Sequence, residues 1–525
     1  MQITIDHITI DVNKEQTVMQ AAESAGILIP YMCYLPGHTN HPSCMICLVK
    51  DLDSGNLFPS CAMAVTDGMN LSASSEDVME ARKEALELLL SDHVGDCEAP
   101  CRISCPAFMN IPLMNRLIAA NKDAEALRVV REEISLPLVL GYICPAPCEN
   151  ACRRKKIDQP VSICLLKRFT AQDEIILKTG LEKPETTTGK RVAVIGTGPA
   201  GMAAAFYTLR MGHACVLYDQ NELPGGTLRY SIPGDLLPKP MLDADIESIY
   251  TLGGEFRLNC RVTGELWERE ILPGFDAVIL ATGSKEEHPV DEFGLPILDT
   301  GSVIHRKSFA SGKPGVFGCG SIISEQLLSV RSVSQGKKAA LEADAYLRRN
   351  DELRRKPMFN STIGPLREDE YSEYMQEATD DPRTDPNRGY FSGFSPDEAI
   401  REARRCMHCD CRKPVSCKLR IYADQYGANR RRFAPAERKR LTRNLQHELV
   451  VYEPEKCIRC GLCVEITQNE KELLGLAYVG RGFDVRIKVP FSKTMEEGLV
   501  KTARACVEGC PTGALADKKK DEVMR

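Results

Sequence analysis

The chain has 525 residues, of which 27% are charged, and a formal net charge of −6. This length allows three or four domains, and the acidic balance argues against a nucleic-acid-binding protein. The 23 cysteines are too few for a disulfide-stapled secreted domain, and the first residues lack a signal-peptide pattern. We therefore expect thiolates in the reducing cytoplasm. The longest apolar stretches, such as 134–143, are short and contain proline, so no membrane span is expected.

Residues 1–80 open with isoleucines that alternate in two short runs around Asp6 and His7, and an apolar-periodic segment follows at 18–25. This pattern predicts a β-hairpin and one helix crossing a small sheet. Its loops contain four cysteines, which are Cys33, Cys44, Cys47 and Cys61. A two-iron, two-sulfur (2Fe-2S) cluster requires four thiolates, and four unrelated buried cysteines are the alternative. The spacing resembles the N-terminal ferredoxin domain of the large iron-sulfur subunit of complex I and of related hydrogenase subunits, which implies a β-grasp fold.

Residues 81–180 contain a second group of candidate ligands. One histidine and three cysteines lie at four-residue steps, and they are His93, Cys97, Cys101 and Cys105. Three further cysteines come later, and they are Cys144, Cys148 and Cys152. This number suggests two four-iron, four-sulfur (4Fe-4S) clusters. A lone histidine is more often a surface or packing residue than a ligand, so His93 has that alternative.

The same segment, with its Cys144-Pro-Ala-Pro-Cys148 run, resembles the helical N-terminal domain of the glutamate synthase small subunit and of dihydropyrimidine dehydrogenase. In those proteins the ligands interleave. The resemblance implies one cluster on His93, Cys97, Cys101 and Cys152, and another on Cys105, Cys144 and Cys148. The relatives use a polar residue other than cysteine as the fourth ligand, whereas here Cys164 stands nearby and is our choice.

Residues 181–350 contain a dinucleotide-binding pattern. A buried strand at 191–195 leads into Gly196-x-Gly198-x2-Gly201, and a helix at 203–211 and a strand at 214–218 follow. Glycines let the backbone approach a pyrophosphate, and Asp219, at the end of the second strand, is expected to accept a hydrogen bond from the ribose. A Rossmann-like domain that has lost its cofactor is the alternative.

Later features resemble the FAD-binding half of the glutamate synthase small subunit, and the further residues that this resemblance places at FAD are Gly226, Arg229, Thr282, Gly283, Gly320 and Ser321. Such flavoproteins usually have aspartate where this chain has Ser321. They also contain a second Rossmann domain for NADPH, whereas only 31 residues separate Gly283 from Gly315 here. We therefore expect FAD without its usual hydride donor in this chain.

Residues 351–445 are rich in charge, proline and glycine and are expected to form an irregular connector with short helices. The basic residues of 430–440 are expected to form a solvated face, with docking of an acidic partner as the alternative. A helix at 396–405 leads into four cysteines, which are Cys406, Cys409, Cys411 and Cys417. Four thiols in twelve residues predict a metal site, and we favour a 4Fe-4S cluster over zinc.

Residues 446–525 contain a Cys-x2-Cys-x2-Cys run followed by a distant Cys-Pro pair, and these cysteines are Cys457, Cys460, Cys463 and Cys510. Three thiolates in one turn and a fourth far away are typical of a 4Fe-4S cluster, and a zinc site is the alternative. The segment resembles a ferredoxin-like part of the complex I subunit. Cys506 is expected to be a spare or rival ligand. Three remaining cysteines, Cys215, Cys260 and Cys319, are expected to be inert core residues.

The sequence therefore predicts a multidomain α/β and α+β protein that resembles a complex I large-subunit frame holding a truncated glutamate-synthase-type flavoprotein. Iron-sulfur subunits of soluble NAD-linked hydrogenases and formate dehydrogenases resemble this design. The resemblance implies an electron relay in a larger oxidoreductase without its own substrate site, such as a hydrogenase, formate dehydrogenase or transhydrogenase. Its expected partners are an FMN-bearing NADH dehydrogenase subunit, a small 2Fe-2S subunit and a further catalytic subunit or ferredoxin. Flavin-based bifurcation is open, and the alternatives are a self-contained NAD(P)H oxidoreductase and a zinc-bearing scaffold.

Overall fold

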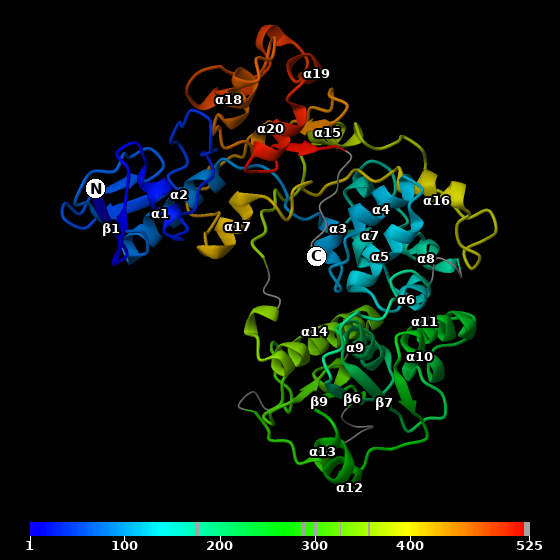
Figure 1. Ribbon diagram of the computed structural model, residues 1–525. Helices are drawn as coiled ribbons and strands as arrows, with labels where there is room; N and C mark the ends of the chain where they lie inside the picture. The colour runs from blue at the N-terminus through cyan, green and yellow to red at the C-terminus, as the bar shows by residue number, and fades with distance from the viewer. Residues whose placement is uncertain (174–177, 285–289, 299–301, 326, 355–357, 519–525) are drawn as a thin grey trace. The chain divides into compact units, whose positions relative to one another are not determined.

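The computed structural model describes residues 1–173, 178–284, 290–298, 302–325, 327–354 and 358–518 (Figure 1). The chain forms two compact units. Unit one comprises Met1–Ala99, Pro357–Gln376 and Cys409–Arg525, and unit two comprises Pro100–Lys356 and Glu377–His408. Unit two therefore interrupts unit one in the sequence.

A five-stranded sheet of order β2-β1-β5-β3-β4 begins unit one. Its strands are β1 (Gln2–Ile5), β2 (Ile8–Asp11), β3 (Leu48–Asp51), β4 (Leu57–Pro59) and β5 (Asn70–Ser72). β1 and β2 form the expected hairpin, and its turn residues Asp6 and His7 have φ values of 46° and 69°, as a type I′ turn requires. Helix α1 (Val18–Ser24) begins at a capping box between Thr17 and Gln20, and its Val18 is buried in the core against the sheet.

A second core of unit one joins segments that lie far apart in the sequence. Helix α2 (Glu76–Ser91) contributes Leu86 and Leu90, and helix α17 (Lys418–Gln425) contributes Leu419 and Ala423. The same core contains residues of three cysteine-bearing loops, including Met32, Cys33, Cys44, Ile46, Cys417, Cys460 and Leu462. Packing of apolar side chains therefore fixes α17 against α2 and holds these loops in place.

The C-terminal part of unit one contains two small antiparallel sheets. They pair β11 (Val450–Tyr452) with β14 (Leu515–Asp517) and β12 (Ala477–Val479) with β13 (Arg486–Lys488). The helices of this part are α18 (Leu462–Asn469), α19 (Met495–Gly498) and α20 (Ala503–Gly509). The short helix α15 (Tyr371–Met375) also belongs to unit one.

Unit two begins with a helical part, whose helices are α3 (Pro100–Ser104), α4 (Ile111–Ala119), α5 (Asp123–Glu133), α6 (Pro137–Ile143), α7 (Pro147–Asn150), α8 (Ile163–Gln172) and α16 (Pro396–Ala403). Helices α6 and α8 pack closely at Gly141, where a Cβ atom would lie 2.6 Å from the Cβ of Arg168. Helix α16 begins at a capping box between Ser395 and Glu398, close to the predicted helix start at residue 396.

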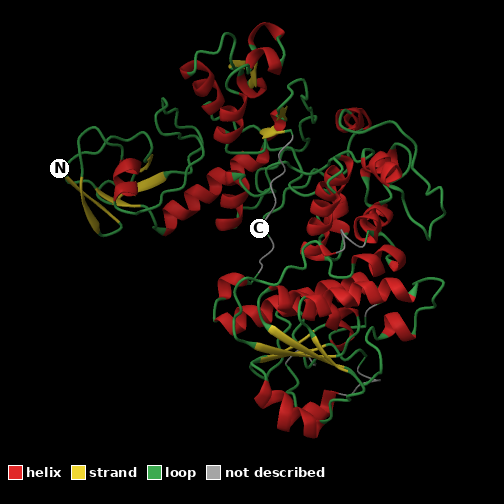
Figure 2. Ribbon diagram, turned by 45° about the vertical axis from the view of Figure 1, so that its right-hand side comes forward, coloured by secondary structure: helices red, strands yellow, loops and turns green. Residues whose placement is uncertain are grey.

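The second part of unit two is a parallel sheet of order β10-β9-β6-β7-β8 (Figure 2). Its strands are β6 (Arg191–Ile195), β7 (Ala214–Tyr218), β8 (Glu255–Arg257), β9 (Ala277–Leu280) and β10 (Val316–Gly318). A parallel sheet of this kind is what the predicted dinucleotide-binding pattern requires. Its helices include α9 (Pro199–Arg210), α10 (Thr227–Tyr230), α11 (Lys239–Thr251), α12 (Gly264–Leu266), α13 (Leu272–Gly274) and α14 (Ser329–Arg348).

One proline and one glycine, Pro199 and Gly336, affect the helices that pack on the parallel sheet. Helix α9 begins four residues before the predicted start at residue 203, because Pro199 is suited to the first turn of a helix. Helices α9 and α14 touch along their backbones at Gly336, where a Cβ atom would lie 2.2 Å from the carbonyl oxygen of Ala200. Within the described ranges, no helix has both the length and the apolar composition that crossing a membrane requires.

Candidate cluster sites and nucleotide pocket

Four buried thiols meet in the loops around the N-terminal sheet. The Sγ atoms of Cys33 and Cys44 lie 3.3 Å apart, and Cys61 forms side-chain hydrogen bonds with Cys33 and Cys47. The N–H of Ser43 donates to Cys33 Sγ at 3.4 Å. Hydrogen bonds from Cys44 and Cys61 hold the pKa of the Cys33 thiol well below its usual range. The structure thus brings these four predicted ligands together, and a four-thiol set is what a 2Fe-2S cluster requires.

A buried lysine lies among four cysteines of unit two. Those cysteines are Cys105, Cys144, Cys148 and Cys164. Lys167 Nζ lies 3.9 Å from Cys164 Sγ, and Cys164 forms side-chain hydrogen bonds with both Cys144 and Cys148. Burial lowers the pKa of Lys167, but the nearby thiolates outweigh it and raise this pKa above its ordinary value. A 4Fe-4S cluster on four thiolates is negatively charged, so a buried ammonium suits this set.

The sequence analysis missed Lys167, although a signal was present. Lys167 lies three residues after Cys164 on α8, and residues at this separation share one face of a helix. Its Nζ also donates to the carbonyl of Leu140 at 3.0 Å, so the ammonium is fixed in position. Cys164, which we chose from the sequence as the fourth ligand, lies with the other three thiols around Lys167.

The C-terminal cysteines line one small cavity of about 20 Å³, and they are Cys457, Cys460, Cys463 and Cys510. Arg459 and Gly461 have left-handed φ values of 55° and 81°, which turn the backbone sharply around the first three cysteines. The N–H of Arg459 donates to Cys457 Sγ at 3.4 Å. Cys506 is not among the residues that line this cavity, and its Sγ donates to the carbonyl oxygen of Cys463 at 3.8 Å.

The remaining predicted ligands are divided between the two units. Unit one contains His93, Cys97, Cys409, Cys411 and Cys417, and unit two contains Cys101, Cys152 and Cys406. The N–H of Cys411 donates to the carbonyl of Cys97 at 3.2 Å. Spacing did not predict that Cys97 lies beside a cysteine of the connector. In the part of the chain that the structure describes, no three His, Cys, Asp or Glu side chains have the geometry that holds one metal ion.

The basic run at 430–440 pairs with carboxylates of unit one. Arg432 contacts Glu84 and Glu87, at 3.2 and 2.9 Å. Further ion pairs join Arg438 to Glu370, Lys439 to Asp92 and Arg440 to Asp369. These pairs explain much of the basic run without an acidic partner.

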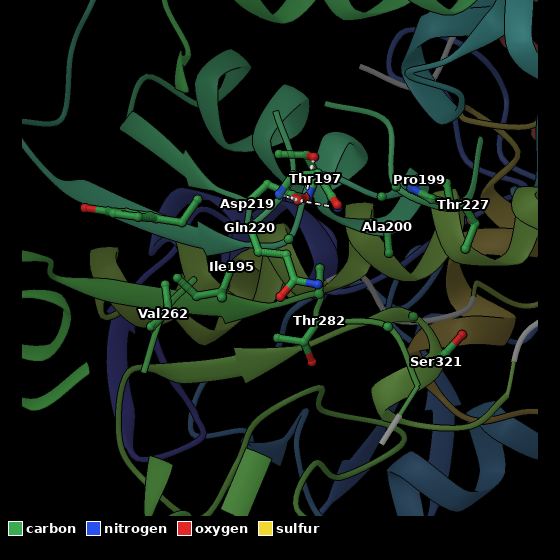
Figure 3. A pocket seen from close by; sticks show the side chains of 18 of the residues that line it. Ile195, Thr197, Pro199, Ala200, Asp219, Gln220, Thr227, Val262, Thr282 and Ser321 are labelled. Atoms are coloured by element: carbon green, nitrogen blue, oxygen red, sulfur yellow. Dashed lines mark hydrogen bonds between the residues drawn. The ribbon is translucent and has the colours of Figure 1, made fainter. Parts of the chain in front are cut away.

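A cavity of about 330 Å³ opens beyond the carboxyl end of β6 (Figure 3). β6 is the central strand of the sheet, and the strand order runs in opposite directions on its two sides. Such folds bind nucleotides beyond the carboxyl ends of the strands at this point. Most of the residues predicted to bind the cofactor line the cavity, namely Gly196, Gly198, Asp219, Gly226, Thr282, Gly283, Gly320 and Ser321.

The other two predicted residues, Gly201 and Arg229, do not line the cavity. A Cβ atom at Gly201 would lie 1.9 Å from the carbonyl oxygen of Gly196, so only glycine allows this loop to meet α9. Arg229 Nε donates to the carbonyl of Pro224 at 2.6 Å and holds the neighbouring loop. At Gly198, a Cβ atom would meet no protein atom within 4 Å, which leaves room for a ligand at the start of α9.

Asp219 lines the cavity, and both oxygens of its carboxylate accept hydrogen bonds within the protein. Its Oδ2 accepts hydrogen bonds from the N–H and the Oγ1 of Thr197, at 2.8 and 2.6 Å. Its Oδ1 accepts from the N–H and the Nδ2 of Asn221, both at 2.9 Å. A carboxylate offers about four acceptor positions, so this one is occupied in holding the glycine loop.

Other polar groups of the pocket remain for a ligand. Thr282 Oγ1 is buried and has no hydrogen-bond partner among the described residues. Figure 3 shows Thr282, Gln220 and Ser321 around the cavity, and the sequence analysis missed Gln220. The glycine loop, the N-terminus of α9 and the unpaired Thr282 hydroxyl fit a dinucleotide with a pyrophosphate and hydroxyl groups.

Three family models match parts of the chain. Residues 1–76 match a 2Fe-2S iron-sulfur cluster binding domain, and residues 75–178 match the 4Fe-4S cluster domain II of dihydropyrimidine dehydrogenase. Residues 194–241 match an NAD(P)-binding Rossmann-like domain. These matches confirm the expected N-terminal 2Fe-2S domain, a 4Fe-4S domain and a Rossmann-like domain.

Several curated proteins are similar to part of this chain. The NADPH-Fe(3+) oxidoreductase subunit beta of Geobacter sulfurreducens is 35% identical over 37% of this chain and 29% of its own length. The NADP(+)-dependent formate dehydrogenase subunit beta of Moorella thermoacetica is 36% identical over 35% of this chain and 29% of its own length. The NADPH glutamate synthase small chain of Bacillus subtilis is 32% identical over 37% of this chain and 41% of its own length. The relatives are oxidoreductase subunits, and the chain spans less than half of each.

Proposed function

We propose that this chain is the iron-sulfur flavoprotein electron-transfer subunit of an NAD(H)-linked oxidoreductase complex in the cytoplasm. The observation that carries this proposal is the grouping of buried and partly buried free thiols into sets of four around the N-terminal loops, around Lys167 and around the C-terminal cavity. Iron-sulfur clusters on such sets supply one-electron transfer when they are bound. The partial similarity to beta subunits of multi-subunit oxidoreductases supports the proposal.

FAD is the cofactor that we propose for the cavity beyond β6. The N–H groups at the start of α9 are suited to hold its pyrophosphate, and Gly198 leaves the space that this group needs. Thr282 and Gln220 offer hydroxyl and amide groups for its sugar and ribityl parts. FAD, when bound, supplies the exchange between two-electron and one-electron transfer.

The partners that we propose are an FMN-bearing NADH dehydrogenase subunit, a small 2Fe-2S subunit, and a further catalytic subunit or ferredoxin. They follow from the resemblance to complex I and to soluble NAD-linked hydrogenases and formate dehydrogenases. On this proposal NADH reduces the chain through the FMN subunit, and flavin-based bifurcation requires that ferredoxin be reduced in the same turnover.

The test is anaerobic reduction of the full chain by NADH, followed by visible absorbance. We expect little bleaching with NADH alone and rapid bleaching when the purified FMN subunit is added, while dithionite bleaches the chain in both cases. Reduction that is no faster with the FMN subunit than without it would contradict the proposal.

A self-contained NAD(P)H oxidoreductase is the second candidate. The match of residues 194–241 to an NAD(P)-binding Rossmann-like domain favours it. This candidate predicts that the isolated chain reduces a dye acceptor with NADH or NADPH, at a rate that no partner increases. The experiment above therefore separates the two candidates.

A further inference from the structure

We infer that His93, Cys97, Cys411 and Cys417 form one iron-sulfur site, assembled from two segments that lie on either side of unit two in the sequence. The inference rests on the proposed function, because it assigns the ligands of one of the proposed clusters. It differs from the grouping expected from the sequence. There the resemblance to the glutamate synthase small subunit implies that Cys97 shares a cluster with Cys101 and Cys152, and Cys411 and Cys417 belong to a separate metal site.

The backbone places the three cysteines together in unit one. The N–H of Cys411 donates to the carbonyl of Cys97 at 3.2 Å, although 313 residues separate them in the sequence (411 − 97 − 1). The side chain of Cys97 interacts electrostatically with that of Cys411. The side chain of Cys417 interacts in the same way with those of Cys411 and Cys97. The three thiols therefore lie near one another.

Each sulfur also receives a backbone N–H group. The N–H of Ser361 donates to Cys97 Sγ at 3.4 Å. Hydrogen bonds from the backbone of Lys413 and of Arg420 lower the pKa of Cys411 and of Cys417 against the effect of burial. Cys417 is the N-cap residue of α17, a position that favours a thiolate. Such N–H groups tune clusters when they point at their sulfur ligands.

His93 supplies a fourth donor beside these thiols. Its Nδ1 atom is buried and has no hydrogen-bond partner among the described residues, and the ring forms a hydrogen bond with the backbone of Lys456. Since Nδ1 has no partner, Nε2 makes that bond. A ligating histidine needs this arrangement, with one nitrogen free and the other held by a backbone group.

Lys456 connects the histidine segment to Cys411. A Cβ atom at Gly95, between His93 and Cys97, would lie 2.5 Å from Lys456 Cε. A Cβ atom at Gly513 would lie 2.3 Å from Cys411 Sγ and 3.8 Å from Lys456 Cδ. One buried cation is therefore packed against both segments, as Lys167 is packed among the thiols of its own set.

The spacing of these side chains favours a cluster over zinc. Zinc holds four ligands on one ion, which brings its sulfur ligands to within roughly 4 Å of one another. Among the side chains that the structure describes, no three His, Cys, Asp or Glu groups have such single-ion geometry. A cluster binds one ligand on each of several irons and therefore accepts wider spacing.

The test is iron and sulfide analysis of the full chain, purified and reconstituted without oxygen, with electron paramagnetic resonance (EPR) of the reduced protein. We expect Cys97→Ala and Cys417→Ala each to lose about four irons, and the double variant to lose about four rather than about eight. The double variant of Cys97 and Cys101 is expected to lose about eight irons. His93→Cys is expected to keep its iron and to change the EPR signal of this one cluster.

The control is Cys215→Ala, which removes a buried thiol of β7 and should keep all the iron. The EPR signal of the N-terminal 2Fe-2S cluster reports whether each variant is folded. A loss of about eight irons in the double variant of Cys97 and Cys417 would overturn the inference but not the proposed function. A loss of only about four irons in the double variant of Cys97 and Cys101 would do the same. A parent chain that contains little iron would overturn the proposed function, and this site with it.

Discussion

The buried Lys167 ammonium gives a sharp prediction about the cluster proposed for Cys105, Cys144, Cys148 and Cys164. Reduction adds a negative charge to a cluster, and a nearby positive charge stabilises the reduced form. Replacing Lys167 with methionine keeps much of the volume of the side chain but removes its charge. We therefore expect Lys167→Met to lower the reduction potential of this one cluster.

The structure gives the size of the effect. Lys167 Nζ lies 3.9 Å from Cys164 Sγ. At an effective dielectric constant of about 20, unit charges at this distance interact by about 4 kcal/mol. The added electron is spread over the whole cluster, so we take about half of this value. About 2 kcal/mol corresponds to a decrease of roughly 90 mV for a one-electron couple.

The assay is a potentiometric titration of the anaerobic chain followed by EPR. Lys155→Met is the matched control, because Lys155 is exposed in the same unit and its charge is screened by solvent. One signal should shift down in Lys167→Met while the others keep their potentials, and iron analysis shows that the cluster is still bound. An unchanged set of potentials in a fully loaded variant would refute this account of Lys167.

Three further predictions concern the pocket and the fold. Gly198→Ala should lower the affinity for flavin by roughly tenfold or more. It should leave the melting temperature unchanged, because the added Cβ meets no protein atom. Gly234→Ala is the control, since its Cβ also meets no protein atom and this variant should keep its flavin. Arg420→Met should destabilise the chain by about 3–5 kcal/mol in thermal unfolding, because it removes one partner of the buried ion pair with Glu98. The exposed ion pair that Arg269→Met removes should contribute less than about 1 kcal/mol. Burial raises the pKa of Asp245 to about 7, so the folded state favours its protonated form. Stability should therefore fall as pH rises from about 4 to about 7, and Asp245→Asn should remove this part of the pH dependence of the melting temperature.

Local patterns were predicted well, because neighbouring residues determine them. The hairpin around Asp6 and His7 follows from alternating isoleucines and a two-residue turn. The loop that begins at Gly196 follows from glycine positions at which a side chain would strike the backbone. The four cysteines of residues 33–61 meet in the loops around one small sheet, so their closeness in the sequence indicated a common site.

Long-range packing was not visible in the sequence. Cys97 and Cys411 are neighbours only because the core of unit one closes across an inserted unit, with α17 packed against α2. Asp219 has the expected position at the end of β7, but its oxygens are used by Thr197 and Asn221, and the sequence does not show how hydrogen bonds are shared. Lys167 and Lys456 were missed because a lysine usually lies on the surface. The position of Lys167 three residues after Cys164 was a signal, but only the structure shows the other thiols around its ammonium.

The stoichiometry of metal and flavin in the anaerobically purified chain tests the central claim most directly. Iron, acid-labile sulfide, zinc and extractable flavin are measured on one sample. The account predicts about 18 irons and one FAD per chain, as one 2Fe-2S and four 4Fe-4S clusters require. About 14 irons with one zinc would mean that one of the sites that include the cysteines of residues 406–417 binds zinc instead. Little iron and no flavin would contradict the electron-transfer function itself.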